Sequence, residues 1–196
     1  MSQAVGNPFS TRHTRPGAMA YRFPPGEGAD QLVERLRAAG WRGQIVGPHG
    51  SGKSTLLAAL LPAMERAGQR PLVVELHDGQ RRLPRDFRRS VGAATAAIVV
   101  VDGYEQLAPW NRYRLRRLCR RRKLGLLVTT HRPTGLPDLF RTEIAPELAW
   151  DLVEHLLAGL PPLLTPEQLR ERLAMRHGNV REVFFDLYDL YELRKT

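Results

Sequence analysis

The eight residues from 47 to 54 carry the clearest chemistry in this chain. They read Gly-Pro-His-Gly-Ser-Gly-Lys-Ser, the pattern G-x-x-x-x-G-K-[ST] of a phosphate-binding loop. Glycines let the backbone wrap closely around an anion with its N–H groups pointing inward. Lys53 would reach the β- and γ-phosphates of a nucleotide, and the hydroxyl of Ser54 would coordinate Mg²⁺. The residues predicted to bind a nucleoside triphosphate are Gly47, Pro48, His49, Gly50, Ser51, Gly52, Lys53, Ser54 and Thr55.

Such a loop works only between a strand and a helix, and the flanking residues predict both. Residues 44–46, Gln-Ile-Val, are a short strand-like run. Residues 55–61 are apolar apart from Thr55 and open a helix. The positive end of that helix dipole would favour the same phosphates.

A second acidic group is needed for Mg²⁺, and Asp102 is the candidate. It ends the continuous apolar run of residues 97–101, a pattern typical of a parallel strand buried on both faces. Strands also end in Asp for the sake of a turn, so the pattern gains its force from the phosphate loop before it. We expect Asp102 to hold the metal opposite Ser54.

Hydrolysis also needs a group that orients the attacking water. Many ATPases have Glu directly after the metal-binding Asp, whereas here Gly103 follows and the next acid is Glu105. We predict that Glu105 activates the water. The alternative is that Glu105 is a first-turn residue that favours a helix dipole.

Two threonines end the next predicted strand, residues 124–130. In a parallel sheet this strand would lie beside the strand that carries Asp102. A hydroxyl of Thr129 or Thr130 would then point at the γ-phosphate or its water. A capping or turn role is the alternative for each, and His131 is interpreted as a loop residue rather than a base.

The remaining pattern predicts an α/β fold: a P-loop NTPase three-layer fold with a mainly parallel five-stranded sheet, followed by a small C-terminal helical lid. The predicted domains are an N-terminal arm and helix at 1–40, a core at 41–146 and a helical lid subdomain at 147–196. Further predicted strands are 71–76 and 140–145, and further predicted helices are 30–39, 81–89, 104–122, 147–158, 166–175 and 180–193.

This order of loop, acidic strand, polar-ended strand, short fifth strand and helical lid resembles an AAA+-type ATPase. Residues 177–182, His-Gly-Asn-Val-Arg-Glu, resemble the Gly-Asn-x-Arg segment that opens the final lid helix in that family. The resemblance implies that Arg181 senses the γ-phosphate and that Arg141 is an arginine finger offered to a neighbouring subunit of a homo-oligomer. The chain departs from the family in lacking an Asp-Glu pair and in its short core and lid.

Positive charge is concentrated in the first two thirds of the chain. The net charge is +10, and residues 1–135 carry 23 basic and 9 acidic side chains. Eight of the twelve residues from 112 to 123 are basic and none is acidic. Together with the arginines of 81–89 they could bind nucleic acid or an acidic protein. A solvated charged face, or arginine-rich codon usage, is the alternative.

The composition also limits compartment and ligand. The single cysteine, Cys119, excludes an internal disulfide and fits a reducing cytoplasm. No apolar run is long enough for a membrane span, and residues 1–10 lack a secretory signal. The chain has no Asn/Thr-Lys-x-Asp guanine motif, which favours ATP over GTP.

Three functions follow in order of preference. The first is a Mg²⁺-dependent ATPase that acts as a motor or switch on a macromolecular partner. The second is an ATP-binding switch or scaffold with little or no hydrolysis, which the glycine after Asp102 favours. The third is a small-molecule kinase, for which Asp78 and the arginines of 81–89 are the only acceptor-side candidates.

Overall fold

The computed structural model describes residues 6–93 and 97–195, which divide into two compact units. One unit consists of residues 21–47 and 53–142 and contains the whole β-sheet. The other consists of residues 6–20, 48–52 and 143–195 and is helical. Each unit has its own apolar core and is described separately.

The sheet has five strands in the order β2-β3-β4-β1-β5, and all neighbouring strands are parallel. β3 and β4 occupy the middle and are aliphatic and buried over almost their whole length, as strands covered on both faces must be. The prediction of a parallel five-stranded sheet is confirmed. The strand bounds are β1 Arg42–Val46, β2 Pro71–Glu75, β3 Ile98–Asp102, β4 Gly125–Thr130 and β5 Asp138–Arg141.

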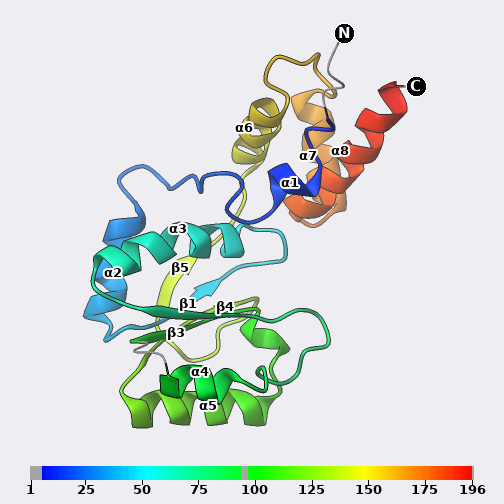
Figure 1. Ribbon diagram of the computed structural model, residues 1–196. Coiled ribbons are helices and arrows are strands. Elements are labelled where there is room, and N and C mark those ends of the chain that lie inside the picture. The colour runs from blue at the N-terminus through cyan, green and yellow to red at the C-terminus, as the bar shows by residue number, and fades with distance from the viewer. Residues whose placement is uncertain (1–5, 94–96, 196) are drawn as a thin grey trace. The chain divides into compact units, whose positions relative to one another are not determined.

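Two pairs of helices cover the two faces of this sheet (Figure 1). Alternating side chains of β3 point to opposite faces, so Val100 packs with α2 (Ala29–Ala38) and α3 (Lys53–Arg66). Val99 and Val101 pack instead with α4 (Phe87–Ala93) and α5 (Pro109–Arg122). The result is the predicted three-layer α/β arrangement.

The predicted helix at 104–122 is wrong at its beginning. Residues Tyr104–Gln106 form a single 3-10 turn, η1, after which the chain runs extended through Leu107 and Ala108. α5 begins at Pro109, because proline lacks an N–H and its fixed φ suits the first position of a helix. The predicted helix at 81–89 is also displaced, since α4 begins only at Phe87.

The fifth strand exists, but the predicted bounds of 140–145 are wrong. β5 is Asp138–Arg141, and its register with β1 pairs Ile45 with Phe140 across a bulge. The strand ends at Arg141, and the next helix, α6 (Pro146–Leu156), begins five residues later. Arg141 is therefore the last residue of the strand.

The helical unit comprises a short α1 (Thr11–Thr14) with α6, α7 (Pro166–Met175) and α8 (Val180–Lys195). Phe9 is 1% exposed in its core, and the ring of Phe184 lies 6.1 Å away. A capping box of Thr165 and Gln168 begins α7. The predicted C-terminal helices are thus confirmed to within two residues at each end. Within the described ranges, none of the helices combines the length and apolar character that crossing a bilayer would require.

Candidate active site

The predicted site residues of the sheet unit follow three strands that are neighbours in the sheet. β4 lies between β3 and β1, and Thr130 of β4 is in register with Val46 of β1. Gly47, the first loop residue, donates its N–H to the carbonyl of Thr130 at 3.1 Å. The segments after the three strands therefore leave the sheet at the same edge, where parallel α/β folds bind their ligands.

The phosphate-loop residues adopt backbone conformations that fit an anion-binding turn. Gly50 and Gly52 have φ of 68° and 86°, a region that other residues rarely adopt. Ser51 donates its hydroxyl to the carbonyl of Pro48 at 2.9 Å, which closes the turn on itself. α3 then begins at Lys53, so the N–H groups of its first turn have no partner within the helix and suit a phosphate.

Lys53 is 8% exposed, which is unusual for an ammonium group. Its Nζ donates to the carbonyl of Gly47 at 2.7 Å. Burial lowers the pKa of Lys53, and the negative charges of Glu105 and, to a smaller extent, Asp102 oppose that effect. A poorly hydrated ammonium near two carboxylates gains more from an incoming anion than a hydrated one would.

Thr129 holds the end of β3 in place. Its hydroxyl donates to Oδ1 of Asp102 at 2.5 Å and accepts the N–H of Gly103 at 2.8 Å. Both partners lie where β3 turns into η1, so one buried side chain orients Asp102 and anchors the turn. Thr130 instead donates its hydroxyl to the carbonyl of Arg132 at 2.9 Å. The expectation that either threonine contacts a γ-phosphate stays a prediction.

Gly103 explains why this chain lacks an Asp-Glu pair. Its φ is 78°, and a Cβ at this position would lie 2.6 Å from the carbonyl oxygen of Leu76. Any side chain there would overlap the backbone beyond the end of β2. The turn after Asp102 is therefore possible only with glycine, and the first acidic residue that can follow is in η1.

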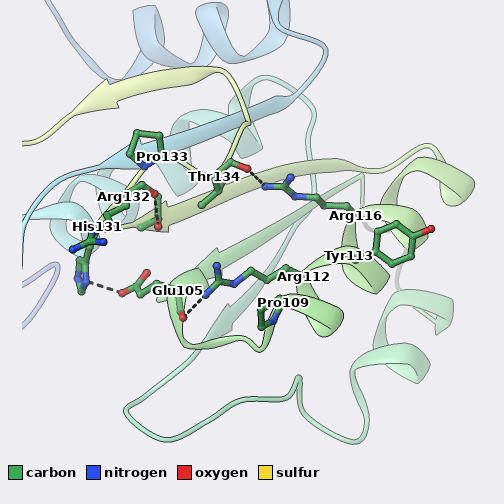
Figure 2. Close-up of a pocket in the computed structure, with 10 residues that line it drawn as sticks. Glu105, Pro109, Arg112, Tyr113, Arg116, His131, Arg132, Pro133 and Thr134 are labelled. Carbon is green, nitrogen blue, oxygen red and sulfur yellow. Dashed lines mark hydrogen bonds and ion pairs between the residues drawn. The ribbon is translucent and has the colours of Figure 1, made fainter.

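Glu105 of η1 pairs with a residue that the sequence interpretation placed in a plain loop. Nε2 of His131 lies 3.2 Å from Oε1 of Glu105, and each side chain is 23% exposed (Figure 2). The main-chain carbonyl of Glu105 accepts a bond from Nη2 of Arg112 at 2.6 Å. His131 does lie in a loop, but its contact with Glu105 was not predicted, although its place directly after β4 could have indicated that it lies beside the segment after β3.

Glu105 and His131 lie at one end of a pocket of about 530 Å³, and Tyr113 of α5 lies at the other (Figure 2). Arg116 forms part of its wall, donating to the hydroxyl of Tyr104 at 3.0 Å and to the carbonyl of Thr134 at 2.5 Å. Arginines of α5 thus bridge the segments that follow β3 and β4. They keep η1 and the turn after β4 at a set spacing.

Mg²⁺ fits the donors that the sequence predicted. Among the described residues, no group of three or more His, Cys, Asp or Glu side chains could form a metal cage. Mg²⁺ is commonly bound by one or two protein oxygens together with phosphate oxygens and water. Asp102, whose Oδ1 is held by Thr129, and the hydroxyl of Ser54 offer oxygen donors of this kind.

The two arginines implied by the family resemblance are found in different surroundings. Arg141 forms an ion pair with Asp138 through two hydrogen bonds of 2.9 and 2.6 Å. Bonds from Gln44 and Arg141 lower the pKa of Asp138. The guanidinium of Arg181 lies 5.9 Å from the ring centroid of Phe185 on the same helix. Whether either arginine contacts a nucleotide stays a prediction.

Within the helical unit, loop residue Gly50 lies against the beginning of α8. A Cβ at position 50 would overlap Oδ1 of Asn179 and lie 3.2 Å from the N of Arg181. The positive φ favours glycine here, and a Cβ would also displace the side chain of Asn179. The segment that resembles a lid motif thus contacts the phosphate-loop residues of its own unit.

Comparison with known proteins addresses the fold. No family model matches this chain, and no curated protein matches it in sequence. Among solved structures, it is similar to the replication initiator DnaA bound to AMPPCP and single-stranded DNA, with a TM-score of 0.56 and 17% identity over 89% of this chain. The likeness and the parallel sheet show a P-loop NTPase-like α/β fold. The chain spans 64% of the length of that DnaA chain.

The parallel sheet and this structural likeness confirm the predicted fold class, including the helical segment after the sheet. At 17% identity the likeness shows the fold alone.

Proposed function

We propose that this chain binds ATP with Mg²⁺ and hydrolyses it, acting as a motor or switch on a macromolecular partner. The phosphate loop, the buried Lys53 and the AAA+-like fold support nucleotide binding. The similar DnaA structure contains AMPPCP, an ATP analogue, which favours ATP as the ligand. The absence of a guanine motif from the sequence agrees with that choice.

The loop N–H groups and Lys53 would bind the β- and γ-phosphates. Ser54 and Asp102 would hold Mg²⁺, which when bound neutralises charge that develops on the phosphates. Thr129 would act as a positioning residue, because its hydroxyl bonds to Asp102. By resemblance, Arg181 would sense the γ-phosphate and Arg141 would be offered to a neighbouring subunit after leaving Asp138.

The observation that carries hydrolysis is the pair formed by Glu105 and His131 at the edge of the sheet. Glu105 would accept a proton from water while the water oxygen forms a bond to the γ-phosphorus. The bond from that phosphorus to the bridging oxygen breaks, and the bonding electrons leave with ADP. His131 would orient the carboxylate, which also influences the pKa of Lys53 more than Asp102 does. The charge of Glu105 acts on Lys53, which we expect to bind the phosphates.

The test is phosphate release from ATP and Mg²⁺ by wild type, Glu105→Gln and Lys53→Ala. General-base removal typically lowers turnover by roughly 10²–10⁴-fold. Glu75→Gln is the matched control, since Glu75 is exposed and in register with Asp102 in the neighbouring strand. Glu105→Gln should keep its affinity for a fluorescent ATP analogue, and the control should keep both properties. Turnover by Glu105→Gln at the wild-type rate would exclude Glu105 as the base.

The ATP-binding switch is distinguished in the same experiment. Wild type that binds the analogue but releases no phosphate with Mg²⁺ would support the switch and overturn the ATPase. The glycine after Asp102 no longer favours that alternative. The close approach of Leu76 accounts for glycine, and Glu105 provides a carboxylate nearby.

A further inference from the structure

α5 has an exposed face that begins with two aromatic rings. Trp110 is 65% exposed and Tyr113 is 52% exposed. Their rings stack on each other, with centroids 5.5 Å apart and an angle of 24° between the planes. The core does not need them, because Leu115 and Cys119 form the buried side of this helix. Large rings held in water in an ordered stack suggest a ligand with flat faces.

The same face continues into arginines. Arg114, Arg117 and Arg121 are exposed and lie at helical spacings from Trp110. At a rise of about 1.5 Å per residue, the face from Trp110 to Arg121 is roughly 16 Å long. No residue of α5 is acidic. We call these five residues, Trp110, Tyr113, Arg114, Arg117 and Arg121, the α5 face.

The structure separates these arginines from the ones that hold the candidate active site. Arg112 and Arg116 are partly buried and donate to the carbonyls of Glu105, Leu107 and Thr134. They also lie 5.7 Å from the ring centroid of Tyr104. Arg112 and Arg116 therefore have a structural role inside the protein. The arginines of the α5 face point to solvent and would be available to a partner.

We propose that the α5 face binds single-stranded nucleic acid, with bases stacked on Trp110 and Tyr113 and phosphates on the arginines. Stacking platforms beside positive charge are how proteins bind single strands without reading their sequence. A duplex hides the faces of its bases, and an acidic peptide offers charge without rings. Arginine-rich codon usage would explain the arginines but not an exposed aromatic stack among them.

The position of the α5 face relates it to the candidate active site. Tyr113 lines the pocket whose other end holds Glu105 and His131. Arg112, its neighbour in the chain, bonds to the carbonyl of Glu105. A strand bound to α5 would therefore contact the helix that positions Glu105. The inference names the partner of the proposed ATPase and in that respect rests on the proposed function, although strand binding itself requires no hydrolysis.

The test measures binding without nucleotide, by fluorescence anisotropy of labelled oligo(dT) and oligo(U) at several salt concentrations. Trp110→Ala with Tyr113→Ala should weaken binding by about tenfold or more, as loss of base stacking does. Arg114→Ala with Arg117→Ala should reduce the slope of log affinity against log salt by about 1.4, the value for two phosphate contacts on a single strand. All the mutated side chains are exposed, so circular dichroism should show an unchanged fold.

Arg35→Ala with Arg37→Ala is the matched control for charge. Both arginines are exposed on α2 in the same unit, and their removal lowers the net charge equally. The control should leave the salt slope unchanged. A stronger effect of the α5 pair than of the α2 pair supports the proposal. Equal effects would mean that only net charge matters and would overturn it.

Comparing oligo(dT) with oligo(U) identifies which kind of strand binds more tightly. Tight binding of either oligonucleotide supports the proposal if it is lost when Trp110 and Tyr113 are replaced. The proposal would be overturned if the aromatic substitutions left strand binding unchanged. It would also be overturned if duplex DNA or heparin bound with the same affinity as oligo(dT) and kept that affinity after the substitutions. Phosphate release, measured separately, distinguishes the two proposals. If strand binding depends on the aromatic pair but no ATP is hydrolysed, only the proposed ATPase activity is overturned. ATP turnover with strand binding indifferent to the pair would overturn this inference alone.

Discussion

Gly103→Ala tests whether the turn after β3 positions Glu105. The substituted residue would keep φ near 78°, which costs an L-residue about 1–2 kcal/mol. Its Cβ would also lie 2.6 Å from the oxygen of Leu76, and relieving such overpacking costs about 1–3 kcal/mol. We expect the free energy of unfolding to fall by about 2–5 kcal/mol. Because the overlap is with backbone, η1 must shift and carry Glu105 away from His131.

The chain contains a matched control for this substitution. Gly68 also has a φ of 78°, but no atom lies within 4 Å of a Cβ built there. Gly68→Ala should therefore lose only the conformational term of about 1–2 kcal/mol. Urea unfolding of both variants isolates the overlap with Leu76 as the difference between them. Phosphate release should fall strongly in Gly103→Ala and remain near wild type in Gly68→Ala, while both bind a fluorescent ATP analogue.

Two results would refute this reasoning. Equal destabilisation by both variants would mean that the carbonyl of Leu76 moves aside without cost. Full turnover by a destabilised Gly103→Ala would mean that the position of η1 does not control hydrolysis. The first result would remove the explanation offered for the missing Asp-Glu pair, and the second would remove the proposed link between η1 and hydrolysis.

Three further predictions concern buried groups. Thr129→Val should lower the free energy of unfolding by about 1–3 kcal/mol in urea, because Asp102 and the N–H of Gly103 lose a partner, and Thr129→Ser should restore most of it. Burial lowers the pKa of Lys53 from 10.5, so Lys53→Met should stabilise the nucleotide-free protein against urea unfolding at pH 7. That gain should shrink as pH rises through the lowered pKa toward 10.5, where the folded protein releases the proton before the unfolded chain does. Burial raises the pKa of Cys119 to about 11, so maleimide at pH 8 should label folded protein at least about 100-fold more slowly than urea-unfolded protein.

The sequence predicted the parts of the fold that depend on local patterns. The apolar run before Asp102 and the run before Thr129 are buried central strands, as continuous hydrophobic stretches indicate. The loop between β1 and α3 has the glycine conformations that its motif requires. Where strand and helix alternate, the right-handed crossover rule leaves few sheets to choose from.

Element boundaries failed where proline and long-range pairing decide them. Pro109 could be read as an interior residue of one long helix, but it begins α5 and leaves η1 as a separate turn. β5 begins two residues earlier than predicted, because its bounds depend on the bulged pairing with Gln44 of β1. The contact between Glu105 and His131 depends on strand order as well, since the two residues follow different strands. The spacing of residues along the chain does not predict the order of strands in the sheet.

Strand order also gives α5 a position that its composition could not indicate. The helix packs Leu115 and Cys119 under β4 and turns Arg112 and Arg116 toward the segments after β3 and β4. Those inward contacts orient the remaining side chains, which is why its arginines fall into a bonded set and an exposed set. A helix anchored in this way to the carbonyl of Glu105 cannot shift without moving that residue. Any partner that binds the α5 face therefore binds an element on which the geometry of the proposed base depends.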